Sequence, residues 1–391
     1  MPVAQKLTAM IEGQSWIRKM FTEGARLKAE YGPENVFDFS LGNPDPPPPA
    51  QFYQVLQEVA ADEKLSHGYM PNSGWPQVCQ SVADYLTKEQ GLALGAKNII
   101  MTVGAAGGLN VILKALLDPG DEVVTPTPYF VEYAAYAENH AGRLVTAPSL
   151  PDFHLDLKAM EAALGERSRA VLINSPHNPT GVVYSAEELA QLAQVLERAS
   201  QRFNRRIYLI ADEPYRKIIY DDLKAPSVWQ AYPHSMIVAS YSKDLSLAGE
   251  RIGFLAVSPG AEDAEMIVAA STLANRILGY VNAPSLMQLV VGQLQGVSVD
   301  VSIYQRRRDL LCEGLTRLGY EHTLPQGAFY LFPKSPLPDD VEFTRRLAEE
   351  RILVVPGVGF GAPGYFRISY CVAEETIRRS MEGFARVIEK I

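Results

Sequence analysis

The sequence predicts an α/β protein with a mainly parallel central sheet and helices on both faces, together with a smaller α+β domain. The first observation is an alternation of short β-branched runs with stretches of helical apolar spacing from about residue 98 onward. The second is a change of pattern beyond about residue 285, where a long helix precedes short strand-like runs near 329–332, 352–355 and 366–371. The runs that we interpret as strands of the central sheet are 99–103, 122–125, 144–147, 170–174, 207–212 and 236–240.

The length of 391 residues is sufficient for two domains, each with its own hydrophobic core. We expect residues 1–45 to form an N-terminal arm and part of the small domain, 46–285 to form the large α/β domain, and 286–391 to form the small C-terminal domain. Apolar spacing predicts a first helix over 7–29. The Gly-Asn-Pro-Asp sequence at 42–45 and the prolines after it predict a rigid, extended crossing segment.

Composition and charge argue against several classes of function. The formal net charge of -9 opposes non-specific binding to nucleic acid or to an anionic membrane, and the basic run at 306–308 is interpreted as a solvated helix face. No apolar run reaches the ~18 residues that a membrane span needs, and the first residues do not resemble a signal peptide. The widely spaced cysteines suggest neither disulfides nor a zinc or other metal site, so we expect a cytoplasmic protein; they are Cys79, Cys312 and Cys371.

Small or polar residues follow four of the predicted strands. Ligands bind beyond the carboxyl ends of the strands in a parallel sheet, so these positions are candidates for a site. After the run 99–103, five small residues at 104–108 precede a helical pattern, and such a turn presents free N–H groups to an anion such as phosphate. Neither GxGxxG nor GxxxxGK[ST] is present, and tight packing of the helix on the strand is an equal alternative here.

The next two strand ends carry amide and carboxylate side chains. After Asn174 the segment 175–181 reads Ser-Pro-His-Asn-Pro-Thr-Gly, and its two prolines fix a turn that holds Asn178 near the strand end. Asp212 ends an apolar strand, and Tyr215 follows three residues later. A carboxylate buried there is costly unless a cation or a hydrogen-bond donor meets it, although capping of the following segment is the simpler role.

The fourth strand end leads to a lysine. Lys243 follows the run 236–240, and Arg251 lies in the Gly-Glu-Arg-Ile-Gly sequence at 249–253. A lysine in a partly buried, positively charged pocket has a lowered pKa and can form a Schiff base with a carbonyl compound, whereas most lysines lie on the surface. The neighbouring strand ends favour the reactive role, because they offer a phosphate-type turn, a carboxylate, hydroxyls and an arginine.

Taken in order, these motifs resemble the fold-type I pyridoxal-phosphate enzymes, specifically the class I and II aminotransferases related to aspartate aminotransferase. The resemblance extends from residues 40–45 to Arg367, and its specific motifs lie at 178–181, 212–215, 240–243 and 249–253. It implies that pyridoxal 5'-phosphate is held as a Schiff base on Lys243. It also implies ping-pong transfer of an amino group between an L-amino acid and a 2-oxo acid.

The resemblance implies roles for the residues that would surround the cofactor ring. Lys243 would also move a proton between the substrate Cα and the cofactor C4′. Asp212 would pair with the protonated pyridine nitrogen and keep the ring an electron sink. Asn178 and Tyr215 would bind the ring oxygen, and Tyr129 would stack on the ring face.

The phosphate and the substrate carboxylate would be bound on either side of the ring. Tyr69 matches a tyrosine that reaches the phosphate of the neighbouring subunit, which implies an obligate homodimer with shared sites. Arg367 matches the arginine that clamps the α-carboxylate, with Gly42 and Asn174 beside it, although a surface ion pair is the alternative for Arg367. Phosphate would be bound by Gly104, Ala105, Ala106, Ser240, Ser242 and Arg251, where Ala105 and Ala106 replace the Ser, Thr or Lys that many relatives have.

Other functions remain open at this point. A different reaction on the same scaffold, such as β-elimination, decarboxylation or cyclopropane formation, is the nearest alternative, because a fold does not fix its chemistry. A transcription regulator with an aminotransferase-like ligand domain would need a DNA-binding extension, and the chain starts almost directly with the first predicted helix. Arg276 is a candidate for binding a second substrate carboxylate from the partner subunit, and surface placement is the equal alternative.

Overall fold

A seven-stranded sheet forms the centre of the fold in the computed structural model, which describes residues 3–4, 7–8, 11, 16–65 and 67–391. The strand order is β2-β8-β7-β6-β5-β3-β4. β8 pairs antiparallel with both β2 and β7, and the remaining pairs of this sheet are parallel. The predicted mainly parallel α/β fold is therefore confirmed. The strands are β2 (Ile99–Thr102), β3 (Glu122–Thr127), β4 (Arg143–Pro148), β5 (Ser168–Asn174), β6 (Tyr208–Asp212), β7 (Ser235–Ser240) and β8 (Gly253–Val257).

β8 is the strand of this sheet that the sequence pattern did not predict. It begins at Gly253, the last residue of a glycine-flanked motif whose composition is typical of a loop. The six predicted strands are present, and their ends agree with the structure to within two residues. The antiparallel strand matters for the site because it continues directly from the motif that carries Arg251.

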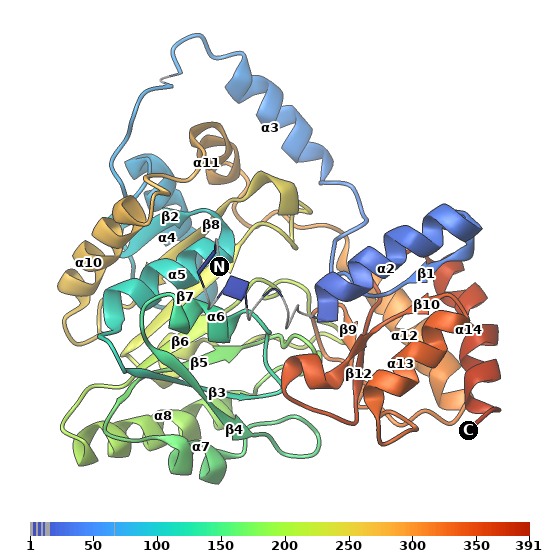
Figure 1. The fold of residues 1–391 in the computed structure, drawn as a ribbon. Coiled ribbons are helices and arrows are strands. Elements are labelled where there is room, and N and C mark those ends of the chain that lie inside the picture. The colour runs from blue at the N-terminus through green and yellow to red at the C-terminus, as the bar shows by residue number, and fades with distance from the viewer. Residues whose placement is uncertain (1–2, 5–6, 9–10, 12–15, 66) are drawn as a thin grey trace.

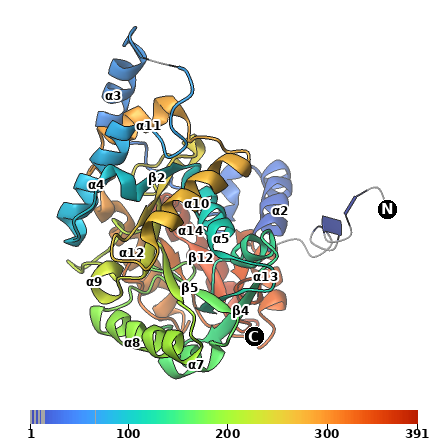
Figure 2. The ribbon, with the colours of Figure 1, turned by 90° about the vertical axis from the view of Figure 1, so that its left-hand side faces the viewer.

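Helices cover both faces of the sheet, and the strands β2, β6, β7 and β8 are buried along their whole length. Successive side chains of a strand point to opposite faces. In β5, Leu172 belongs to the core shared with α5 and α10, whereas Val171 belongs to the core shared with α4 and α8. Figures 1 and 2 show α7 and α8 side by side at one side of the molecule. The helices of this part are α3 (Ala50–Ala60), α4 (Pro76–Gln90), α5 (Gly104–Leu116), α6 (Tyr133–Glu138), α7 (Leu157–Ala163), α8 (Ala186–Arg202), α9 (Val228–Ala231), α10 (Ala264–Ile277) and α11 (Ser285–Gly292).

The N-terminal residues pack with the C-terminal part of the chain. Figure 1 shows α2 and β1 in blue beside the orange and red C-terminal elements, and β1 pairs in parallel with β10. A second small sheet has the order β11-β12-β9. The division into domains at 45 and 285 stays a prediction. These elements are α2 (Trp16–Tyr31), β1 (Phe37–Asp38), α12 (Val301–Arg317), β9 (Tyr330–Leu331), α13 (Asp340–Glu349), β10 (Ile352–Leu353), β11 (Val355–Pro356), β12 (Phe366–Ser369) and α14 (Glu374–Ile388), with single 3-10 turns η1 (Pro33–Asn35), η2 (Ala96–Asn98), η3 (Ala248–Glu250) and η4 (Gly357–Phe360).

The first predicted helix, 7–29, falls partly on residues 9–10 and 12–15, which lie outside the described residues. From Trp16 onward it is present as α2, which ends at Tyr31. Among the helices of the described ranges, none combines the length and the apolar character that a bilayer span requires.

The interpretation of the basic run at 306–308 as a solvated face was wrong for two of its three residues. Arg306 is exposed, but Arg307 and Arg308 are buried. Arg307 forms a two-point ion pair with Asp45, and Arg308 forms one with Asp221. The partner carboxylates come from distant parts of the chain, so the helix sequence alone could not reveal them.

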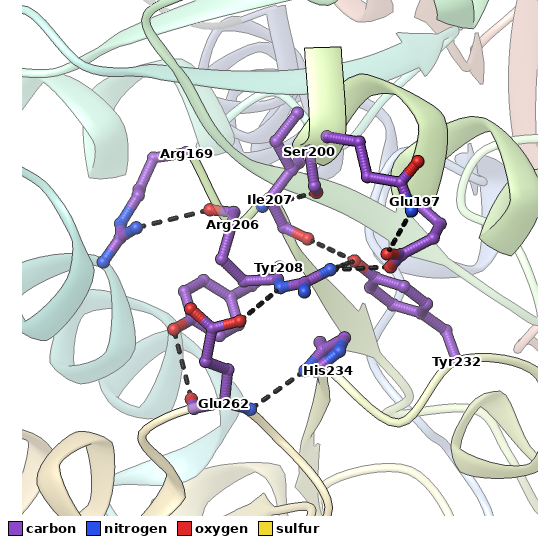
Figure 3. Close-up of polar contacts among 10 residues, drawn as sticks. Arg169, Glu197, Ser200, Arg206, Ile207, Tyr208, Tyr232, His234 and Glu262 are labelled. Carbon is purple, nitrogen blue, oxygen red and sulfur yellow. Dashed lines mark hydrogen bonds and ion pairs between the residues drawn. The ribbon is translucent and has the colours of Figure 1, made fainter. Parts of the chain in front are cut away.

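A polar network joins the elements at the amino end of β6 (Figure 3). The Arg206 guanidinium lies 2.6 Å from a Glu197 carboxylate oxygen and 3.0 Å from one of Glu262. The Tyr232 hydroxyl donates to the Ile207 carbonyl at 2.8 Å and lies 3.5 Å from Arg206. These contacts tie α8 and the segment after β8 to the start of β6. The opposite, carboxyl end of β6 is where the predicted site residues lie.

We expect Arg206→Met to lower the free energy of unfolding by about 2 kcal/mol, because it removes charge-assisted hydrogen bonds from a side chain that is only 17% exposed. Arg198→Met is the matched control, because Arg198 and its partner Glu161 are exposed, and it should cost about 0.5 kcal/mol or less. Urea denaturation at one protein concentration measures both values. Equal losses in the two variants would contradict a structural role for this network.

Candidate active site

A cavity of about 270 Å³ lies at the carboxyl ends of the parallel strands. β5 and β6 are paired so that Asn174 and Asp212, their last residues, are direct neighbours, and β7 ends beside them at Ser240. This register places the polar strand ends around one space. The predicted site residues that line this cavity are Gly42, Ala105, Ala106, Asn174, Asn178, Asp212, Tyr215, Ser240, Ser242, Lys243, Arg251 and Arg367.

Lys243 extends into the cavity and is held by a backbone carbonyl. Its Nζ donates a hydrogen bond to the Gly42 carbonyl at 2.7 Å. Burial lowers the pKa of Lys243 to about 8, and the positive charges of Arg367 and Arg251 act in the same direction. At pH 7 about one tenth of this amine is therefore unprotonated, far more than for an ordinary lysine, and the unprotonated form is the one that acts as a nucleophile or a general base.

Asp212 is buried with only one of its carboxylate oxygens satisfied. Oδ2 accepts a hydrogen bond from the Tyr133 hydroxyl at 2.6 Å, whereas Oδ1 has no partner among the described residues. Asn174 Nδ2 donates to the Asp212 carbonyl at 2.7 Å and so fixes the strand end. Burial raises the pKa of Asp212 to about 7, and the Tyr133 hydrogen bond opposes that rise. An unsatisfied carboxylate oxygen beside a cavity requires a donor from a ligand, and the protonated ring nitrogen of pyridoxal phosphate fits this requirement.

Arg367 is a buried cation that forms no ion pair with a carboxylate of the described chain. Its guanidinium lies between the rings of Tyr330 and Phe360, 4.7 and 4.8 Å from their centroids. It donates to Asn178 Oδ1 at 3.1 Å and to the Ser40 carbonyl at 2.6 Å. Burial lowers its pKa, so an anionic ligand would stabilise its charge. A planar, uncompensated guanidinium suits the carboxylate of an amino acid.

Two hydroxyls and one amide border the space between Lys243 and Arg367. The Tyr215 hydroxyl lies 2.9 Å from that of Tyr330, and burial raises the pKa of Tyr215 well above its usual value, so this group is a neutral donor. The Asn178 backbone N–H donates to Asn174 Oδ1 at 2.7 Å, and its side-chain oxygen accepts from Arg367. Asn178 Nδ2 is therefore the atom that can donate to a ligand.

The other end of the cavity has the character of a phosphate site. α5 begins at Gly104, whose φ of 67° suits a glycine, and the next two residues line the cavity. A Cβ at Gly104 would lie 3.1 Å from a guanidinium nitrogen of Arg251, so the arginine packs over the helix start. Ser240, Ser242 and Arg251 line the same cavity as the start of α5, so hydroxyls, a cation and the free N–H groups of a helix N-terminus are available there to an anion.

Three predicted cofactor residues do not line this cavity: Gly104, which begins α5 beside it, Tyr129 and Tyr69. Tyr129 donates its N–H to the Phe360 carbonyl at 3.1 Å, and its ring lies beside Gly361. Its neighbour Phe130 does line the cavity, so Phe130 is a candidate for the stacking role expected of Tyr129, and that role stays a prediction. Tyr69 is 95% exposed and lies away from the cavity of its own chain, so its predicted role in a neighbouring subunit stays a prediction.

The sequence interpretation missed several residues at the site. Tyr133, which binds Asp212, and Tyr136, which lines the cavity, are three residues apart on α6 and therefore share one helix face. That spacing was a usable signal. Tyr330 and Ser40 act through contacts between distant segments, which no local pattern indicates. The described residues contain no group of three or more His, Cys, Asp or Glu side chains arranged for a metal ion.

Comparison with known proteins gives a consistent result over nearly the whole chain. The family described as Aminotransferase class I and II matches residues 34–384. The aspartate/prephenate aminotransferase of Thermus thermophilus is 34% identical over 89% of this chain and 90% of its own. The aspartate aminotransferase of Pyrococcus horikoshii is 30% identical over 96% and 95%.

Solved structures agree with these matches. A crystal structure of an amino transferase from Eubacterium rectale superimposes with a TM-score of 0.96 and 41% identity, covering 100% of this chain and 99% of that one. An aspartate aminotransferase from Thermus thermophilus with maleate gives a TM-score of 0.88 and 30% identity, covering 99% and 100%.

The buried Asp212 carboxyl should lower the stability of the cofactor-free protein as the pH rises. Its pKa is near 7 in the folded state and near 4 in the unfolded chain, so the folded state binds more protons between these values and loses stability across that range. Asp212→Asn removes this ionisation. We expect the gain in free energy of unfolding of this variant over the wild type to be about 2 kcal/mol larger at pH 8 than at pH 5.

Denaturation of the cofactor-free protein at both pH values measures this difference. Asp118→Asn, at an exposed aspartate, controls for the loss of one negative charge. A stability gain that does not depend on pH would show that Asp212 is not held in the way the structure implies.

Proposed function

The chain belongs to the class I and II aminotransferase family, and on this premise we propose that its cavity binds pyridoxal 5'-phosphate at Lys243. The protein is an aminotransferase that transfers amino groups between amino acids and oxo acids. Enzymes of this family use pyridoxal phosphate. The single observation that supports the cofactor site most strongly is the unpaired, buried Oδ1 of Asp212 at a cavity that also contains a lysine of lowered pKa.

When bound, pyridoxal phosphate supplies a ring that accepts electrons from the substrate Cα. Asp212 Oδ1 would accept a hydrogen bond from the protonated ring N–H, and this positive partner would favour the ionised carboxylate despite its burial. Tyr215 and Asn178 Nδ2 would hold the ring oxygen by hydrogen bonds. Phe130, rather than Tyr129, would supply an aromatic ring against the cofactor. Lys243 would serve as the base that takes the proton from the substrate Cα and as the acid that returns a proton on the cofactor side.

The phosphate group binds at the start of α5. Gly104, Ala105 and Ala106 offer backbone N–H groups, because Ala105 and Ala106 have no hydroxyl to contribute. Arg251 supplies a positive charge to the phosphate, and the Ser240 and Ser242 hydroxyls supply further hydrogen-bond donors. The backbone of the helix therefore carries a larger share of phosphate binding than in relatives with polar side chains in this turn.

Arg367 binds the α-carboxylate of the amino acid and then that of the 2-oxo acid. Both substrates carry this group, so one arginine serves both half-reactions of a ping-pong mechanism. Gly42 and Asn174 border the same end of the cavity. A Cβ at Gly42 would come within 1.8 Å of the Tyr330 hydroxyl, so a larger residue there would displace the carboxylate site.

The functional unit is a homodimer with shared sites. Tyr69 is almost fully exposed in one chain and is assigned to the phosphate of the partner subunit. Apolar side chains on α10 that are exposed in one chain favour a second copy as their cover: Met266, Leu273 and Ile277. All three cysteines of the chain are free and buried, which suits the reducing cytoplasm that we assign to the enzyme.

Lys243→Ala should retain cofactor through Asp212, Arg251 and the Gly104 turn but lose turnover by about 10³-fold or more, because no group remains to move the Cα proton. Steady-state assays measure the rate. Borohydride reduction of the loaded wild type, followed by peptide mass spectrometry, should find the pyridoxyl group on Lys243. Lys97→Ala, at an exposed lysine, is the control. Near-normal turnover of Lys243→Ala would overturn the assignment.

Aspartate is the first donor to test, because it gives its name to several of the relatives. Arg276 is exposed at the end of α10 and is the candidate that would bind the second carboxylate from the partner subunit. We expect Arg276→Ala to raise the KM for aspartate about tenfold through the loss of one charge-assisted hydrogen bond, with little change for alanine. A kinetic screen of aspartate, glutamate, alanine and aromatic donors measures this. Unchanged aspartate kinetics would dismiss the role of Arg276.

A further inference from the structure

An extended segment, residues 40–45, supplies backbone carbonyls to two cations of the site. The Ser40 carbonyl accepts from Arg367 at 2.6 Å, and the Gly42 carbonyl accepts from Lys243 Nζ at 2.7 Å. Residues 41–45 belong to no helix or strand. The carbonyls can orient these side chains only if something outside regular secondary structure fixes the segment in place.

One end of the segment is fixed by the sheet and the other by an ion pair. The Phe39 N–H, next to β1, donates to the Leu353 carbonyl at 2.8 Å. At the far end, Asp45 Oδ1 and Oδ2 accept from the two terminal guanidinium nitrogens of Arg307 at 2.5 and 2.8 Å. A two-point contact of this kind fixes direction as well as distance, and the Arg307 side chain is only 9% exposed.

The next residue of α12 offers a natural comparison. Arg308 forms a two-point pair with Asp221 at 2.5 and 3.0 Å, and its side chain is 4% exposed. The two aspartates are similarly exposed, at 35% for Asp45 and 45% for Asp221. The two ion pairs therefore resemble each other in geometry and burial. They differ in two respects: only Asp45 belongs to the segment that binds Lys243 and Arg367, and Arg308 also binds the Asp309 carboxylate and the Pro325 carbonyl.

We propose that the Asp45–Arg307 ion pair positions the carbonyls of Ser40 and Gly42, and through them Arg367 and Lys243. Asp45 and Arg307 are then positioning residues for substrate-carboxylate binding and proton transfer, although neither lines the cavity. The inference rests on the functions proposed for Lys243 and Arg367. It also gives a function to a basic residue that the sequence pattern had placed on a solvated face.

The kinetic test compares variants of the loaded enzyme that disturb one pair or the other. Asp45→Asn and Arg307→Gln should each lower kcat/KM for the amino acid and for the 2-oxo acid about tenfold, mainly through a higher KM. Asp221→Asn should keep kcat/KM within about twofold of the wild-type value. Its melting temperature should nevertheless fall by about as much as that of Asp45→Asn. The double variant Asp45→Asn/Arg307→Gln should lose no more than the more damaged single variant, because the two residues act as a unit.

A milder variant keeps the test decisive if these changes impair folding. Arg307→Lys retains the charge but cannot make the two-point contact, and it should shift KM in the same direction by a smaller factor. Hydrogen exchange gives a readout that needs no turnover. The backbone amides of residues 40–43 and 45 should exchange faster in Asp45→Asn than in the wild type, with or without cofactor, and should be unchanged in Asp221→Asn.

Two results would overturn the inference: kinetics of Asp45→Asn within twofold of the wild type, or equal losses in Asp45→Asn and Asp221→Asn. A wild-type protein without transamination would contradict the proposed function instead. In that case the exchange of residues 40–45 still decides whether the ion pair holds the segment.

Discussion

Asp212 ends β6 inside the protein with one carboxylate oxygen bonded to Tyr133 and the other without a partner among the described residues. Such a group is expensive to bury, and its pKa near 7 reflects that cost. The surrounding contacts hold it in place nonetheless, since Asn174 fixes its carbonyl and the parallel register fixes its strand. A ligand that brings a positive N–H group to the free oxygen compensates the cost. We propose that the ring of pyridoxal phosphate is this ligand.

The cations of the cavity show a related arrangement. Lys243 and Arg367 are bound by backbone carbonyls and aromatic rings rather than by carboxylates, so the charge of Arg367 and the amine of Lys243 remain available to ligands. Segments from both ends of the chain meet to achieve this, since residues 40–45 come from the N-terminal part and Arg367 from β12. The parallel pairing of β1 with β10 holds the N-terminal and C-terminal parts of the chain together next to these residues.

Much of this site was predictable because it lies at strand ends. Short apolar runs located the strands, and in a parallel sheet the residues that follow them meet at one edge, so Asn178, Asp212 and Lys243 could be assembled without coordinates. Sequence patterns were insufficient in two situations: where one position along the chain determines which side chain enters the cavity, and where a contact between distant segments determines the partner of a side chain. Tyr129 and Phe130 are adjacent, and only the backbone direction after β3 determines which ring enters the cavity. Arg307 meets a carboxylate 262 positions away in sequence, which helical periodicity cannot show.

The most direct measurement of the central claim is a single half-reaction. The enzyme is loaded with pyridoxal phosphate and incubated with one amino acid in the absence of any 2-oxo acid, and the released products and the form of the cofactor are quantified. The account predicts a stoichiometric release of the matching 2-oxo acid, no ammonia, and a cofactor left as pyridoxamine phosphate until a 2-oxo acid is added. Continuous release of ammonia, with the cofactor remaining as pyridoxal phosphate, would contradict it.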